Sequence, residues 1–95
     1  MKQVIFDFDS IRTMDDFYRE AELKLDLPDY FGNNLDAIWD SLTAYIELPV
    51  FVEFINMTMQ KMHDFAALIL LFEDASDELV EDFFFEFSLK DEMDM

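Results

Sequence analysis

The chain has 95 residues, of which 23 are Asp or Glu and 6 are Lys or Arg, so its formal net charge is −17. This charge repels the phosphates of nucleic acids and of anionic membranes, and it attracts a basic protein. Because 53% of the residues are hydrophobic and 17% are aromatic, the composition excludes a charged, disordered chain. The length suits a single domain, which we expect to span residues 1–95.

The sequence contains no cysteine, which excludes disulfides, thiolate zinc sites and a cysteine nucleophile and fits a reducing compartment. We recognise no secretory signal at the start of the chain and no apolar run of the roughly 18 residues that a membrane span needs. We therefore expect a cytoplasmic protein without a cofactor, and mutual repulsion favours a monomer at low salt. Solubility and adaptation to a salty cytoplasm are alternative reasons for the acidity.

The first third of the chain predicts a strand and then a helix. Between Gln3 and Asp9, Val4, Phe6 and Phe8 alternate with Ile5 and Asp7, at the period of a strand. Apolar residues then recur at helical spacing over residues 13–25, and Thr13 with Asp16 three positions later is typical of a helix N-terminus. Pro28 ends this pattern because it disfavours helix at the preceding residue.

A shaped loop and a second helix follow. Gly32, the only glycine of the chain, marks the loop, since glycine adopts backbone conformations that other residues resist. Asn33 or Asn34 is then a suitable N-cap for an amphipathic helix. Its apolar stripe consists of Leu35, Ile38, Trp39 and Leu42.

The second half of the chain repeats the order of strand, helix and strand. Residues 50–55 are β-branched and aromatic and predict a buried strand. Residues 57–62 predict one or two helical turns, and Asp64 is the expected cap of a longer helix that continues to Phe72. Residues 82–89 predict a last strand with three phenylalanines on one side, and we expect residues 90–95 to fray.

Strands separated by helices indicate a parallel sheet, because parallel neighbours need crossover connections of a dozen or more residues. The predicted fold class is therefore α/β. We expect a single small domain in which a three-stranded parallel sheet is packed with about four helices.

Signatures of catalysis are largely missing from the sequence. It lacks the nucleophile elbow, the phosphate-binding loop and the zinc-protease motif, and His63 is its only histidine. Paired carboxylates occur throughout, so no single pair indicates acid–base catalysis. Neither Asp7-Phe8-Asp9 nor Glu73-Asp74 matches a calcium-binding loop, and solvated charge is the simpler interpretation. We therefore predict no metal site and no enzyme activity.

The second helix carries a polar stripe opposite its apolar one. Asp36, Asp40 and Thr43 fall at positions i, i+4 and i+7, and two acids at i and i+4 repel each other by a few tenths of a kcal/mol. Asp36 gains from the helix dipole near the N-terminus, whereas Asp40 gains little. Asp40 is thus a candidate binding residue, although such pairs also arise by chance in so acidic a chain.

Aromatic residues lie beside these acids along the chain. Tyr30 and Asn34 precede the helix or begin it, and Trp39, Tyr45 and Glu47 flank its other end. Exposed aromatic rings beside carboxylates suit a partner rich in guanidinium groups. The alternative for each ring is a place in the core, and Trp39 could point inward with Ile38.

The stretch from Leu27 to Thr43, LPDYFGNNLDAIWDSLT, resembles the signature of the barstar family of ribonuclease inhibitors. Ile11-Arg12 before the first helix and Glu47 to Pro49 after the second also fit the family. The resemblance covers about residues 1–55. Beyond them, Phe72-Glu73-Asp74-Ala75 and the order of helix and strand can be aligned.

The resemblance implies an inhibitor whose second helix and preceding loop enter the active-site cleft of a basic, extracellular-type ribonuclease. By this resemblance Asp40 takes the place of the substrate phosphate, Asp36 meets an arginine, and Tyr30 packs on the catalytic histidine. The remaining contacts that it implies are Asn34, Leu35, Trp39, Thr43, Glu47 and Asp74. We also expect Ala44 and Tyr45 to contact the partner, at positions where family members often have glycine followed by tryptophan.

Two other interpretations stay open. An immunity or interaction protein of the same fold could neutralise a different basic toxin or nuclease, since folds persist while partners change. A salt-adapted acidic domain without a basic partner is supported by composition alone.

Overall fold

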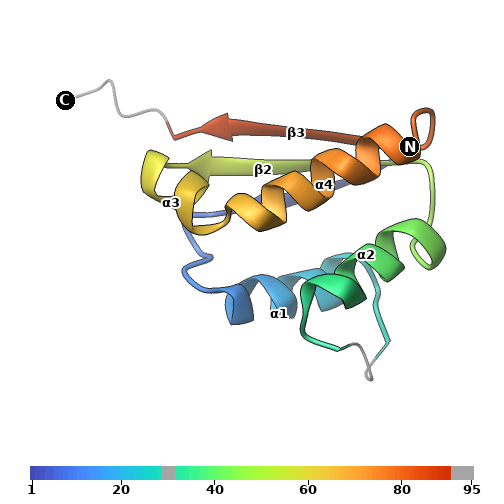
Figure 1. Cartoon of the computed structure of the whole chain (residues 1–95), viewed down its shortest axis with the longest axis horizontal. Helices are drawn as coiled ribbons and strands as arrows, with labels where there is room; N and C mark the ends of the chain where they lie inside the picture. The colour runs from blue at the N-terminus through green and yellow to red at the C-terminus, as the bar shows by residue number, and fades with distance from the viewer. Residues whose placement is uncertain (29–31, 91–95) are drawn as a thin grey trace.

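A computed structural model describes residues 1–28 and 32–90 of the chain, as three strands and four helices (Figure 1). The first half holds β1 (Lys2–Asp7), α1 (Met14–Lys24) and α2 (Leu35–Ala44). The second half holds β2 (Val50–Met57), α3 (Met59–Asp64), α4 (Ala66–Glu78) and β3 (Phe83–Leu89). The strands form one parallel sheet in the order β1-β2-β3, which confirms the predicted fold class.

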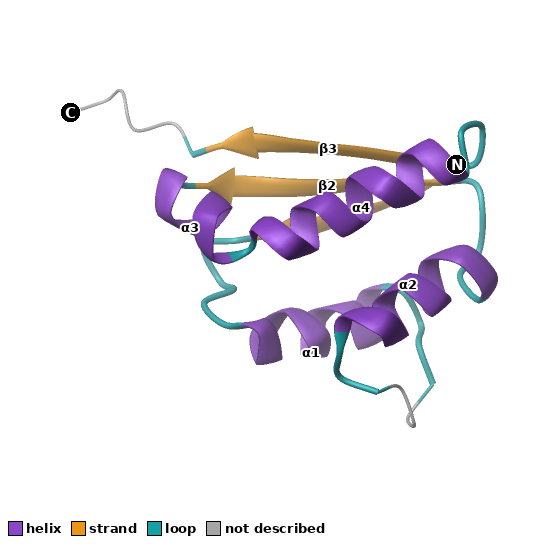
Figure 2. Cartoon of the chain, viewed as in Figure 1, coloured by secondary structure: helices purple, strands orange, loops and turns teal. Residues whose placement is uncertain are grey.

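The four helices cover one face of the sheet (Figure 2). Alternate residues of the strands, among them Val4 and Phe6 of β1 and Val52 and Phe54 of β2, are buried against the helices. Residues between them face the other way, and Ile5 and Phe84 are among the exposed large hydrophobic residues. The sheet therefore has one packed face and one open face, whereas parallel sheets are generally covered on both.

Phe54, on the central strand, lies at the middle of an aromatic core. Its ring centroid is between 4.8 and 5.8 Å from the centroids of rings that come from β1, α1, α4 and β3 and from the turn after β1. These rings belong to Phe6, Phe8, Phe17, Phe72 and Phe85. Because the rings come from both halves of the chain, Phe54 connects the packing of the two halves. The predicted one-sided arrangement of Phe83, Phe85 and Phe87 on the last strand is confirmed by their ring contacts.

Local hydrogen bonds fix both ends of α1. The Thr13 hydroxyl accepts a hydrogen bond from the Asp16 backbone N–H, and the Asp16 side chain accepts one from the Thr13 backbone, so the predicted cap is a complete capping box. At the other end Asp26 adopts a left-handed conformation with φ of 55°, and the Leu27 N–H donates to the Glu22 carbonyl. This Schellman-type ending stops α1 before Pro28 is reached.

The first strand is shorter than predicted. It ends at Asp7 instead of Asp9, because the Asp7 carboxylate accepts a hydrogen bond from the Asp9 N–H and its carbonyl accepts one from the Ser10 N–H. These bonds form a turn. Phe8 is nonetheless fully buried, and its N–H still pairs with the Ile55 carbonyl.

Two predictions in the second half of the chain are wrong. Asp64 does not cap the longer helix, because it is the last residue of α3, where it accepts a hydrogen bond from the Gln60 amide. Phe65 connects α3 directly to α4, and no side chain caps α4. Lys90 is not frayed, since its N–H donates to the Met57 carbonyl and its ammonium group pairs with Asp9. Residues 91–95 lie outside the described residues.

Among the helices that the structure describes, none is long and apolar enough to cross a membrane. No three or more His, Asp or Glu side chains come together as a metal-binding group within residues 1–28 and 32–90.

We expect Phe54→Ala to lower the free energy of unfolding by about 3–5 kcal/mol, because it leaves a cavity at the centre of the ring cluster. Phe84→Ala is the matched control, since Phe84 lies one strand away on the open face and is 37% exposed. Phe84→Ala should lower the free energy of unfolding by much less than Phe54→Ala does. Urea unfolding of both variants measures the difference, and equal losses would contradict the central role of Phe54.

The second prediction concerns Asp7 and Asn56 at the end of the sheet. A hydrogen bond from the Asn56 amide to the Asp7 carboxylate, 2.9 Å long, lowers the pKa of Asp7, and the Asp9 N–H and nearby lysines add to this effect. A lowered pKa stabilises the fold at pH values above the unfolded pKa of about 3.9. The contribution is lost as the pH falls through the folded pKa.

Asn56 has a φ of 60°, so Asn56→Gly removes the hydrogen bond while keeping the backbone conformation. We expect the stability difference between wild type and this variant to be larger at pH 6 than at pH 2.5. Thermal unfolding across this range measures it, and a difference independent of pH would show that Asp7 is not held by Asn56.

Candidate functional site

The second helix is anchored at its start and along one side. Asn34 is its N-cap: the Asn34 Oδ1 accepts a hydrogen bond of 2.8 Å from the Ala37 N–H. Ile38 and Leu42 are fully buried, and Ser41 is buried with its hydroxyl bonded to the Ala37 carbonyl. The apolar stripe predicted from the sequence is therefore the face that α2 turns toward the core, and it leaves the other side to solvent.

The solvent side of α2 carries the predicted polar stripe. Asp36 and Asp40 are exposed, and Thr43 is half-buried with its hydroxyl donating to the Trp39 carbonyl. Ala44 is also exposed, and Tyr45, at the C-terminal end of the helix, is 54% exposed. These residues thus share one accessible helix surface, as their spacing predicts.

The acids of this region have no basic partner among the described residues. The ion pairs of residues 1–28 and 32–90 join Lys2 to Asp26, Arg19 to Asp16, Lys24 to Glu20 and Lys90 to Asp9. None of these pairs involves Asp36, Asp40, Glu47 or Asp74, all of which are exposed. Their negative charge is therefore directed at solvent, where a cationic partner can meet it.

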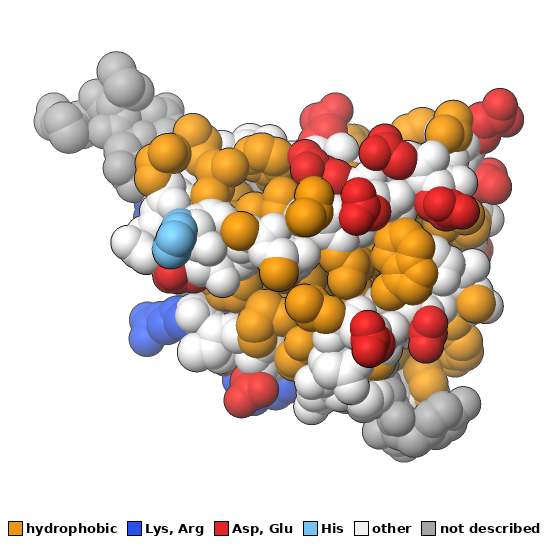
Figure 3. All heavy atoms as spheres, viewed as in Figure 1, with side chains coloured by type: hydrophobic (Ala, Val, Ile, Leu, Met, Phe, Trp, Pro, Cys, Tyr) orange, Lys and Arg blue, Asp and Glu red, His pale blue; other side chains and the backbone are white. Residues whose placement is uncertain are grey.

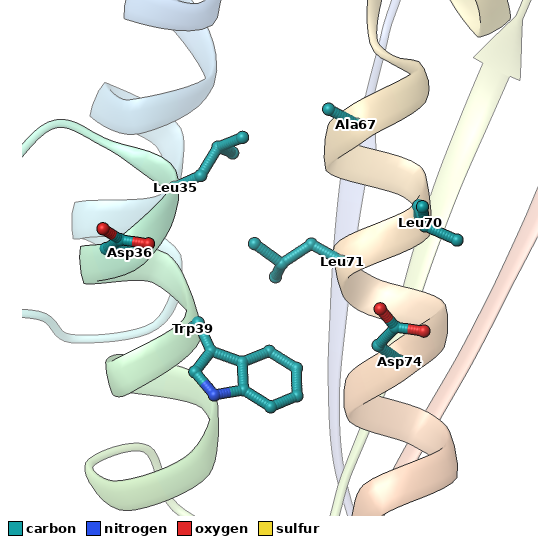
Figure 4. A pocket seen from close by; sticks show the side chains of 7 residues that line it. All are labelled: Leu35, Asp36, Trp39, Ala67, Leu70, Leu71 and Asp74. Atoms are coloured by element: carbon teal, nitrogen blue, oxygen red, sulfur yellow. The ribbon is translucent and has the colours of Figure 1, made fainter.

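Asp74 comes to the same face from the opposite half of the chain. It lies on α4, and together with Asp36 it borders a groove between α2 and α4 (Figure 4). Leu35 and Trp39 of α2 and Leu71 of α4 point toward one another across this groove. On this face of the molecule acidic side chains lie above and below part of a hydrophobic patch (Figure 3).

Trp39 is neither fully inside nor fully outside. It is half-buried, packs against the core and also lines the groove, so its ring is both a support for α2 and a contact surface. Leu35 has the same double position. The alternatives of core and interface, which the sequence left open for Trp39, are thus combined in one side chain.

The structure brings Leu35, Asp36, Trp39 and Asp74 together in the groove, with Asp40, Thr43, Ala44 and Tyr45 on the rest of α2. Glu47 lies on the exposed connection between α2 and β2. Tyr30 lies outside the described residues. Sequence reasoning missed three of the four groove residues that α4 supplies, namely Ala67, Leu70 and Leu71. The signal was present, since residues 66–72 are apolar on every side of a surface helix.

Comparison with known proteins identifies the family of the chain. The family model described as "Barstar (barnase inhibitor)" matches residues 1–92, well beyond the first 55 residues that carried the resemblance. A relative from Bacillus subtilis (strain 168), described as "Putative ribonuclease inhibitor YrdF", is 32% identical over 88 residues. The match covers 87% of this chain and 94% of the relative. The chain therefore belongs to the barstar family of ribonuclease inhibitors.

Proposed function

We propose that the chain inhibits a small basic ribonuclease of the extracellular type by occupying its active site with α2 and the loop before it. The observation that carries this proposal is that Asp36 and Asp40 face solvent on an anchored helix and have no basic partner among the described residues. A carboxylate on such a helix imitates a phosphate oxyanion, because both accept charge-assisted hydrogen bonds from guanidinium groups.

In this proposal the contact residues divide into phosphate mimics, a central contact and outlying acids. Asp40 takes the place of the substrate phosphate among the active-site Arg and His residues of the nuclease, and Asp36 binds a neighbouring arginine. Tyr30, Asn34, Leu35, Trp39 and Thr43 form the centre of the contact. Ala44 and Tyr45 extend it along α2, and Glu47 and Asp74 are outlying acids that bind further basic residues.

Inhibition by this route needs no chemistry from the chain itself. The nuclease loses access to RNA because its phosphate-binding residues are occupied, so the chain acts as an inhibitor and not as an enzyme. The anchoring of α2 lowers the cost of association, since Asn34, Ile38 and Leu42 hold the helix before the partner arrives. The net charge of −17 speeds the approach of a cationic protein.

The biological setting proposed here is protection of the producing cell. A nuclease that acts outside the cell degrades RNA inside it if it folds too early, and a cytoplasmic inhibitor prevents that damage. A free monomer is the form proposed to capture the nuclease, since repulsion between like-charged copies disfavours self-association.

We expect Asp40→Ala to weaken binding to the nuclease by about 2–5 kcal/mol, which corresponds to at least a 30-fold rise in Kd. The expected loss is large because the truncation leaves several cationic groups of the nuclease buried without a partner. The measurement is inhibition of a small basic ribonuclease of the barnase type, titrated with wild type and variant at low and high salt.

Asp64→Ala is the matched control, since it removes the same charge from an exposed position on α3, away from α2 (Figure 1). It should change the association rate slightly and leave the stoichiometry unchanged. If folded wild type does not inhibit, the partner is a different basic protein. If Asp40→Ala and Asp64→Ala behave alike, Asp40 is not at the centre of the contact.

A further inference from the structure

The groove between α2 and α4 has a volume of about 330 Å³. Its lining comes from three residues of α2 and four of α4, namely Leu35, Asp36, Trp39, Ala67, Leu70, Leu71 and Asp74. Leu35 and Ala67 lie at one end, beside the first turns of the two helices, and Trp39 and Asp74 lie at the other (Figure 4). Five of the seven lining side chains are therefore apolar, and the two carboxylates are separated, with Asp36 beside Leu35 on α2 and Asp74 on α4 at the end with Trp39.

Leu70 forms the outer rim of the groove on α4 and is 58% exposed. Its neighbours Leu68, Ile69 and Phe72 are buried in the core, so α4 is held in place without Leu70. A single exposed leucine is ordinary on a protein surface. Leu70 differs from an isolated one because its side chain continues the apolar lining formed by Leu35, Ala67 and Leu71.

The groove is continuous with the surface to which the proposed function assigns nuclease binding, since Asp36 and Trp39 belong to both. Cationic groups of the partner are attracted to Asp36 and to Asp74. On the α4 side, Ala67, Leu70 and Leu71 offer no hydrogen bond, so a charged or polar group buried against these three side chains would lose water without replacing it. A nonpolar group is stabilised when it leaves water and packs against these three side chains.

We infer that the partner nuclease inserts a nonpolar side chain between α2 and α4, over Ala67 and Leu70, beside the basic residues that meet Asp36 and Asp74. This inference rests on the proposed function and adds a condition on the partner: the nuclease must carry an aliphatic or aromatic residue next to its cationic cluster. A second copy of the chain is a poor occupant, because the acids along the groove would face acids of the same sign.

Such a contact would let the inhibitor discriminate between basic nucleases, which charge alone does not do. Any basic nuclease is attracted by the acids, whereas the groove favours the one with a nonpolar residue at the matching position. Leu70 and Ala67 would then be specificity-determining residues, separate from the acids that block the active site.

The test compares Leu70→Ala with Leu23→Ala. Leu23 is 76% exposed on α1 and lines no part of the groove, so the same change at a helix position serves as a matched control. Leucine and alanine are both good helix formers, so both variants should fold. The probe is the member of a panel of small basic ribonucleases that wild type binds most tightly, and the readout is Kd at low and high salt.

We expect Leu70→Ala to raise Kd about five- to tenfold, as the loss of buried apolar surface predicts, and Leu23→Ala to leave it unchanged. The effect of Leu70→Ala should be the same at both salt concentrations, because salt screens charge–charge attraction and not an apolar contact. Asp40→Ala should instead lose part of its effect at high salt.

Ala67→Phe provides a second variant, since Ala67 is exposed and a larger ring fills the groove without entering the core. It should also weaken binding. If wild type binds tightly and both groove variants bind as Leu23→Ala does, the inference is wrong while the proposed function stands. If wild type binds no ribonuclease of the panel, the proposed function fails and the inference fails with it.

Discussion

The fold depends on burying one face of a three-stranded parallel sheet under helices from both halves of the chain. Phe54 of the central strand is where these halves meet, since rings from β1, α1, α4 and β3 surround it. Large aromatic side chains bury much area per residue, which matters in a chain of 95 residues with limited volume for a core. The same packing sets α2 beside α4, so the stability of the core and the geometry of the candidate site have one origin.

This arrangement separates the residues that fold the protein from those that meet a partner. α2 turns Ile38 and Leu42 inward and Asp36 and Asp40 outward, and the Asn34 cap fixes where the helix begins. The repulsion between two acids one helical turn apart costs little, because the buried side holds the helix. The helix can therefore present an acidic surface to a cationic protein, because packing in the core offsets the repulsion between its acids.

Trp39 and Leu35 connect the two roles. Both pack partly against the core and partly line the groove with Asp74, so a partner that contacts them contacts parts of the molecule that are already in place. Binding to such preformed surfaces avoids much of the entropy that ordering a loop would cost. The groove is lined by both α2 and α4, so a partner bound there would contact both halves of the chain.

The sequence by itself determined the order of elements, the cap at Thr13, the parallel sheet and the polar stripe on α2, because periodicity and capping are local properties. It limited the cap of α2 to Asn33 or Asn34, and the structure selects Asn34. It also carried the family resemblance, which the family model extends to residue 92. It misplaced the end of β1 and the start of α4, since a turn at Asp7 and the direct passage from α3 through Phe65 depend on hydrogen bonds made in the folded chain. Only the tertiary structure decided that Asp74, Leu70 and Leu71 lie opposite Leu35 and Trp39, because no local pattern records which side of α4 packs against α2.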